Sequence, residues 1–403
     1  MENTSLLLKA VKETSLNEYI QKLKHVAIVR YVPSKFNLEI WKNSTLKTRM
    51  LYLCLLGLYL VPLIDNFRIA WFIVEHLLSN DGGDALAKFL VMFIKLFSTT
   101  TALIIIWKRD DINHLLQEYE DYVPLHQDER FMEKYYKFGM RYLKSNVCLN
   151  FLSCFVFQLI FPVVFQDPLY LLDILTFPVL RDSNLYLLML IISFLSSIFS
   201  LFIYLPYIAI EGIFESFFID EYNYLSEIFR NFIHQQGNRK HMLEEHANRS
   251  EGLIELINQH AKLCRLLNIA NKVFQFLTAV ILFLHMINLC AIAYELSNNL
   301  VTAKSYTFQI APAAMSATFC VCRLYSGIKI NDSAHQLVDH IYAMPLHDLS
   351  HEAIIKLSFF LHRLTSEQIG ISIGGCFVIN PASVLTLIGS IITYSIVAYQ
   401  TRS

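Results

Sequence analysis

Long apolar runs alternate with shorter polar stretches along this chain. A helix rises 1.5 Å per residue, so about 20 apolar residues cross the roughly 30 Å hydrocarbon core of a bilayer. Seven runs have about this length or more, at residues 51–74, 86–107, 146–165, 185–213, 273–296, 302–324 and 377–400. The pattern predicts an all-α membrane protein with seven transmembrane helices.

Two of the polar stretches have a helical pattern of their own. The fourth run continues beyond residue 213 as a helix projecting from the membrane, and residues 331–369 repeat apolar positions at helical spacing. Such helices contact either a neighbouring subunit or their own subunit, and the pattern leaves both open. We expect a cytosolic N-terminal segment (1–50), transmembrane helices 1–4 (51–214), a cytosolic helical linker (215–270), transmembrane helices 5–6 (271–330), cytosolic anchor helices (331–376), and helix 7 with a short extracellular tail (377–403).

Basic residues predict the orientation, because they collect on the cytosolic side of membrane proteins. With the N-terminus in the cytosol, the outer side holds only Lys88, Arg181, Lys304 and Arg402. Seven spans then place the C-terminus outside the cell, opposite to a G-protein-coupled receptor. The cytosolic side holds the basic first fifty residues together with Lys108, Arg109, Arg141, Lys144, Arg230, Arg239, Lys240, Lys262, Arg265, Lys272, Arg323 and Lys329.

Composition narrows the possible functions. Charged residues make up 17% of the chain, against about 25% in soluble proteins, and the net charge of −1 argues against nucleic acid. The pair Cys320 and Cys322 lacks a second cysteine pair, and the spacing of His241 and His246 differs from a zinc-protease motif. We therefore expect no metal site, no cofactor and no enzymatic activity.

The last apolar run carries a stripe of polar side chains at helical spacing. In lipid an unpaired polar group is costly, so such a stripe faces water or protein. The stripe therefore either lines a pore or packs against neighbouring helices. Its members are Ser383, Thr386, Ser390, Thr393, Val397 and Gln400.

Four stretches resemble a known family. Thr393-Tyr394, followed by five mostly apolar residues and Gln400, resembles the closing motif of insect odorant and gustatory receptors; gustatory members usually follow the glutamine with phenylalanine, where Thr401 stands here. The sequence is similar to the odorant branch at three further sets of positions: His260, Leu263, Leu267, Asn271 and Phe274; Cys322, Gly327, Ser333 and Tyr342; and Phe359 to Arg363 followed by Gly374-Gly375.

The resemblance implies a ligand-gated, nonselective cation channel of four subunits, in which most members assemble with a common co-receptor. The loop between spans four and five is shorter than in that co-receptor, so the chain resembles a ligand-specific tuning subunit. Such subunits lie in the plasma membrane of olfactory sensory neuron dendrites. The resemblance also implies that helix 7 lines the pore, with Val397 as the constriction and Gln400 at the outer mouth. The pore residues would be Ser390, Thr393, Tyr394, Val397 and Gln400.

The family pocket lies in the outer half of spans two, three, four and six. A volatile ligand needs an apolar cavity with a few polar or aromatic contacts, and we expect a small neutral or aromatic compound. By depth in the membrane, the lining residues would be Met92, Phe93, Leu96, Asn150, Ser153, Cys154, Phe157, Met189, Leu190, Phe194, Tyr306, Gln309 and Ile310.

Two other classes stay open. A gustatory channel of the same superfamily is the first alternative, and a G-protein-coupled chemoreceptor is the second. The acidic-arginine-tyrosine triplet typical of G-protein-coupled receptors does not follow the third run, and Asn380-Pro381 lacks the tyrosine of their later motif.

Overall fold

A computed structural model describes residues 107–122, 185–234, 243–297, 303–344 and 349–400, apart from a few isolated positions. In this part the chain is mostly helical, as the apolar pattern predicts. The first three predicted spans lie almost wholly outside the described residues, so their number and orientation stay predictions. The elements are α5 (Arg109–Asp121), α9 (Leu185–His234), α10 (Leu243–Ser297), α11 (Ala303–His335), α12 (Leu337–Tyr342), α13 (His351–Ser366), β1 (Ser372–Ile373), β2 (Phe377–Val378) and α14 (Pro381–Gln400).

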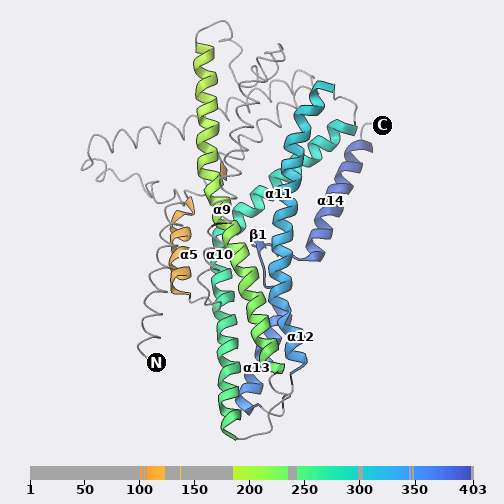
Figure 1. The fold of residues 1–403 in the computed structure, drawn as a ribbon. Helices are drawn as coiled ribbons and strands as arrows, with labels where there is room; N and C mark the ends of the chain where they lie inside the picture. Colours follow the sequence, from red (N-terminus) through yellow and green to blue (C-terminus); the bar gives the residue numbers. More distant parts are fainter. Residues whose placement is uncertain are drawn as a thin grey trace, which may run out of the picture.

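Three long helices, α9, α10 and α11, form the axis of the described part (Figure 1). α9 has 50 residues and α10 has 55, which correspond to about 75 Å or more along each helix axis. This exceeds twice the thickness of a hydrocarbon core, so both helices extend well beyond a single membrane crossing. The predicted extension of the fourth run is confirmed as a continuous part of α9.

α10 continues without a break across residue 271, where we placed the boundary between the linker and the fifth span. Its segment Ser250–Ile287 is long and apolar enough to cross a membrane, judged by length and composition within the described residues. Half of its most apolar window is buried against the rest of the chain, so α10 also serves as a packing core.

A cluster of aromatic side chains packs α5 against α9. Tyr119 of α5 contacts Phe214 and Phe217 of α9 edge to face, with ring centroids 5.2 Å and 5.0 Å apart. These three residues are buried, and such aromatic pairs contribute about 0.5–1.5 kcal/mol each beyond the area they bury. The apolar residues of α9 recur every three or four positions here, which explains why a long helix keeps one face in the core.

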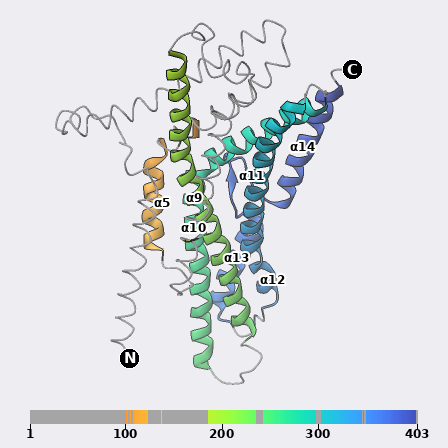
Figure 2. The ribbon, with the colours of Figure 1, turned by 45° about the horizontal axis from the view of Figure 1, so that its top comes forward.

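α12 and α13 cover the end of the bundle where α9 ends and α10 begins (Figures 1 and 2). Ser350 caps α13 by accepting a hydrogen bond from the Ala353 amide at 3.2 Å. The inward face of α13 is apolar, and Phe360 stacks on Phe229 of α9 with centroids 6.1 Å apart. The helical pattern predicted over 331–369 is therefore confirmed, with a break between α12 and α13.

The last helix begins later than its sequence indicates. The apolar run starts at residue 377, but Phe377 and Val378 form β2, which pairs antiparallel with β1, and α14 begins at Pro381. Proline suits the first turn of a helix because it has no amide hydrogen to donate. Our start of helix 7 at residue 377 is therefore wrong by four residues, because hairpin pairing takes the first part of the apolar run.

Candidate functional site

A tight hairpin and a reciprocal cap fix the start of α14. Gly374 and Gly375 form the hairpin turn with φ values of 60° and 75°, a region that favours glycine. Asn380 then caps the helix: its side-chain oxygen accepts from the Ser383 amide at 2.8 Å, and the Ser383 hydroxyl accepts from the Asn380 amide at 2.9 Å. The reciprocal bonds fix where the helix begins.

One face of α14 is packed and the others are open. Ser383, Val384 and Leu387 are half-buried, and the two apolar side chains pack on the core, while α14 contacts α10. These residues lie at helical positions i, i+1 and i+4, so they form one face near the start of the helix. The described side chains beyond Ser390 are all exposed. α14 is therefore attached mainly through its first half.

The predicted polar stripe begins at Ser383 on the packed face of α14 and then continues beside that face, where Thr386 is exposed. Val397 is 48% exposed in this single chain, and Thr393 and Gln400 are also exposed, whereas Ser390 is half-buried. The side chain of Tyr394 lies outside what the structure describes. The hydroxyls of Ser390 and Thr393 donate to backbone oxygens four residues earlier, at 2.9 Å and 2.8 Å. The stripe therefore presents methyl groups as well as polar atoms, because the hydroxyl donors are used within the helix.

A second strip of α14 is exposed and wholly apolar. Successive residues of a helix turn by about 100°, so this strip lies away from both the packed face and the polar stripe. One helix thus has a packed face, a polar exposed face and an apolar exposed face. The apolar strip consists of Leu385, Ile388, Ile392 and Ile396.

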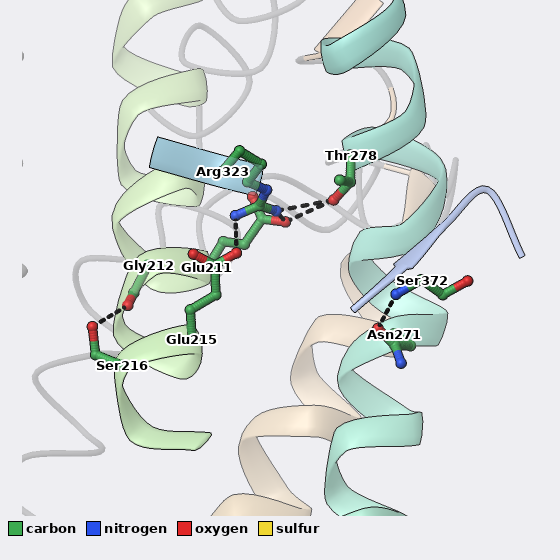
Figure 3. A network of polar contacts seen from close by, with 8 residues as sticks. All are labelled: Glu211, Gly212, Glu215, Ser216, Asn271, Thr278, Arg323 and Ser372. Atoms are coloured by element: carbon green, nitrogen blue, oxygen red, sulfur yellow. Dashed lines mark hydrogen bonds and ion pairs between the residues drawn. The ribbon is translucent and has the colours of Figure 1, made fainter. Parts of the chain in front are cut away.

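A buried charge cluster joins the three long helices (Figure 3). Arg323 of α11 forms ion pairs with Glu211 and Glu215 of α9. Arg323 also donates to the Thr278 hydroxyl of α10 at 2.9 Å, and Thr278 donates to Glu211 at 3.0 Å. The arginine is only 6% exposed and both glutamates are buried. One cation therefore serves two carboxylates in a site closed to water.

The sequence patterns do not predict this cluster. They place Arg323 among the cytosolic charges and assign Glu211 and Glu215 to the fourth run and its extension. The available signal was the i, i+4 spacing of the two glutamates, which places both on one face of α9. In the structure this face of α9 contacts α11 instead of water. A single sequence does not show which of the two a helix face contacts.

A smaller buried polar contact holds the end of α5. The Tyr122 hydroxyl donates to Glu221 of α9 at 3.0 Å. Burial, together with the negative charge of Glu221, raises the pKa of Tyr122 well above its ordinary value. Tyr122 therefore stays protonated and remains a donor at every physiological pH.

The sequence matches a family model described as 7tm odorant receptor over residues 81–389. The chain belongs to this odorant receptor family. The fold agrees: the receptor is similar to the insect olfactory receptor OR5 from Machilis hrabei with a TM-score of 0.68 and 15% identity, covering 96% of this chain and 99% of that one. The same OR5 in complex with eugenol gives a TM-score of 0.65 at the same identity and the same coverage. A search of curated proteins finds no match.

Family membership makes the chain a multi-pass membrane receptor of the plasma membrane. It also confirms the resemblance to the odorant receptor family. The three internal sets of positions lie within the matched residues, whereas the closing motif, Thr393 to Gln400, lies beyond them. Four of the positions that resemble the odorant branch lie around the connection that leads into α14: Asn271, Gly327, Gly374 and Gly375.

The predicted ligand residues of the receptor are only partly within the described part. Glu211 and Arg323 contact each other. Phe194 lies 17 residues before Glu211 on α9, and Tyr306 lies 17 residues before Arg323 on α11. Each interval corresponds to about 25 Å along its helix. Their backbones therefore belong to one layer, while their side chains are outside what the structure describes, as are those of Met189, Leu190, Gln309 and Ile310. The remaining seven lie outside the described residues: Met92, Phe93, Leu96, Asn150, Ser153, Cys154 and Phe157.

Proposed function

We propose that this chain is the odorant-binding subunit of a ligand-gated, nonselective cation channel that assembles with a common co-receptor. It would depolarise olfactory sensory neurons from the membrane of their dendrites. Membership of the odorant receptor family supports the ligand-binding role. The surface of α14 supports the channel role.

The two exposed faces of α14 carry this proposal. The polar stripe suits water, whereas the neighbouring strip of leucine and isoleucine suits lipid or another subunit. A single chain leaves both uncovered, so α14 needs an environment that differs on its two sides. A helix at the wall of a pore between subunits has that environment. A ring of Val397 side chains would close such a pore by excluding water, while Ser390, Thr393, Tyr394 and Gln400 line it.

The cytosolic helices support assembly with other subunits. Phe359 of α13 is 72% exposed, and Tyr342, Leu346 and Ile355 are also exposed near it in the chain. Ile355 and Phe359 are four residues apart on α13, so they lie on one face, and adjacent exposed apolar side chains mark an interaction surface. We propose that the helices over 215–270 and 331–376 make the contacts with the co-receptor.

Aromatic and basic side chains support a cytosolic N-terminus. Exposed Trp107 lies under the Lys108 ammonium, 5.2 Å from the ring centroid, and exposed Tyr325 lies 5.7 Å from the Lys329 ammonium. Tryptophan and tyrosine collect at membrane–water boundaries, and lysine favours the cytosolic one. We place this boundary near Arg323, with α12 and α13 in the cytosol and the end of α14 outside.

The ligand we propose is a small neutral or aromatic volatile compound. The similar OR5 receptor binds eugenol in its complex, which is a compound of this class. The pocket would be formed by the predicted residues of spans two, three, four and six, with Tyr306 and Phe157 as aromatic contacts. Potency that stays unchanged in Tyr306→Ala and Phe157→Ala would argue against this pocket.

Whole-cell recording tests the proposal. Cells expressing this chain with an odorant receptor co-receptor should show a ligand-evoked cation current while G-protein signalling is blocked, and cells lacking the co-receptor should not.

Val397→Ala should change the relative permeability of sodium, potassium and calcium, whereas Ile392→Ala, on the apolar strip of the same helix, should not. A response that vanishes with the G-protein block, or permeability unaffected by Val397→Ala, would reject the channel. A current from this chain alone in response to a soluble tastant would favour a gustatory channel.

A further inference from the structure

The connection between α13 and α14 is fastened to α10. The Asn271 side chain donates to the Gly370 oxygen at 2.9 Å and accepts from the Ser372 amide at 3.0 Å (Figure 3 shows the second bond). One turn further along α10, the Gln275 backbone oxygen accepts from the Gly374 amide at 3.0 Å. The first strand of the hairpin and the start of its turn are therefore bonded to one helix.

The residues just before α14 pack closely against their neighbours. A Cβ atom on Gly370 would lie 2.7 Å from the Val378 side chain, and one on Gly327 of α11 would lie 2.6 Å from Ile379. Both distances are shorter than any ordinary carbon contact, so these glycines are needed for the close approach. The chain that leads into α14 thus has a fixed position between α10 and α11.

The same face of α10 reaches the buried charge cluster. Asn271, Gln275 and Thr278 follow i, i+4, i+7 spacing, so they lie in one row along the helix. Thr278 bonds to Arg323 and Glu211, while a Cβ on Gly374 would lie 3.3 Å from the Ala279 side chain. The hairpin and the charge cluster therefore meet α10 within about 10 Å of each other.

α10 is suited to act as the rigid member of the three long helices. α9 and α11 contain Pro206 and Pro312, and a proline inside a helix removes a backbone hydrogen bond and permits a bend. Both prolines lie before the charge cluster in the chain, on the side of the predicted ligand residues. α10 contains no proline along its full length, so it holds the hairpin and the cluster in a constant relation.

We infer that Asn271 is a positioning residue: it holds the connection before α14 against α10, so that the inner end of α14 becomes a pivot point. The Arg323 cluster fixes the position of this pivot relative to α9 and α11. A ligand that shifts the outer parts of α9 and α11 then tilts the loosely packed second half of α14, where Val397 lies. This inference rests on the proposed channel function and adds the route by which ligand binding reaches the gate.

The test compares ligand-evoked currents, normalised to surface protein, for Asn271→Ala, Asn271→Asp and the control Lys272→Ala. Lys272 is the next residue of the same helix, its side chain is exposed, and it lies outside the helices that we propose to contact the co-receptor. Loss of two hydrogen bonds should lower the maximal current about fivefold to tenfold in Asn271→Ala, because a loosely held pivot transmits less of the movement. Asn271→Asp keeps an acceptor for Ser372 and should fall between. Lys272→Ala should match the wild type.

Two further readouts separate coupling from folding. Thr278→Val should reduce the maximal current as well, and the double variant Asn271→Ala/Thr278→Val should lose less than the product of the two single losses, because both residues act in one path. The melting temperature of each purified variant shows whether current and stability fall together. The inference is overturned if the maximal current per surface protein stays at the wild-type level in Asn271→Ala, if the two losses multiply, or if current tracks melting temperature alone. A wild-type chain that gives no ligand-gated current with the co-receptor rejects the proposed function instead.

Discussion

Replacing Arg323 with methionine should be the most damaging single change to the charge cluster. The substitution keeps much of the side-chain volume but removes the cation shared by Glu211 and Glu215, both buried. Breaking a buried ion pair by removing one partner costs about 3–5 kcal/mol, and loss of the bond to Thr278 adds about 1 kcal/mol. Protein stability is about 5–15 kcal/mol, so this loss would use a large share of it.

Thermal unfolding of the purified receptor in detergent measures this effect. Arg265→Met is the matched control, because Arg265 is 73% exposed and its 3.4 Å pair with Glu118 is worth at most about 1 kcal/mol. Adding Glu211→Gln and Glu215→Gln to Arg323→Met should recover much of the loss, since no buried charge is then left without its partner. An Arg323→Met variant that melts within a degree of Arg265→Met, or a triple variant less stable than the single one, would refute the reasoning.

Two further changes test the packing around the site. Gly327→Ala should destabilise the receptor by about 1–3 kcal/mol, because the new methyl group would overlap Ile379. Adding Ile379→Val should recover part of the loss in melting temperature. Equal melting temperatures for Gly327→Ala and the wild type would contradict the close approach. Tyr122→Phe should cost about 1–3 kcal/mol, because Glu221 loses a buried donor. A melting temperature unchanged by Tyr122→Phe would show that this hydrogen bond contributes nothing to stability.

The sequence predicts the long helices α9, α10, α11 and α14, because long apolar runs with few breakers have few alternatives to helix in lipid. It does not predict α5, which lies in a polar stretch between two apolar runs. It places the start of the last helix at residue 377 instead of Pro381, since a hairpin strand and a membrane helix are both apolar. The Gly374-Gly375 turn was predictable because only glycine adopts such φ values freely.

The charge cluster was not predictable in the same way. Glu211 and Arg323 are 112 positions apart, and which faces of two helices meet depends on packing that one sequence does not encode visibly. Polar residues near the end of an apolar run are usually solvated, so Glu211 and Glu215 resembled an ordinary helix extension. The grouping of Thr393, Val397 and Gln400 on one side of α14 was predictable from helical spacing alone, whereas their exposure was not.

The row formed by Asn271, Gln275 and Thr278 limits how this receptor can change in length. Inserting one residue between Asn271 and Thr278 would rotate the hairpin bonds by about 100° relative to Arg323 and shift them by 1.5 Å. No neighbouring side chain could follow such a turn, so the two attachments would separate. A one-residue insertion between Asn271 and Thr278 should therefore uncouple the hairpin from the charge cluster, although each residue would still be present.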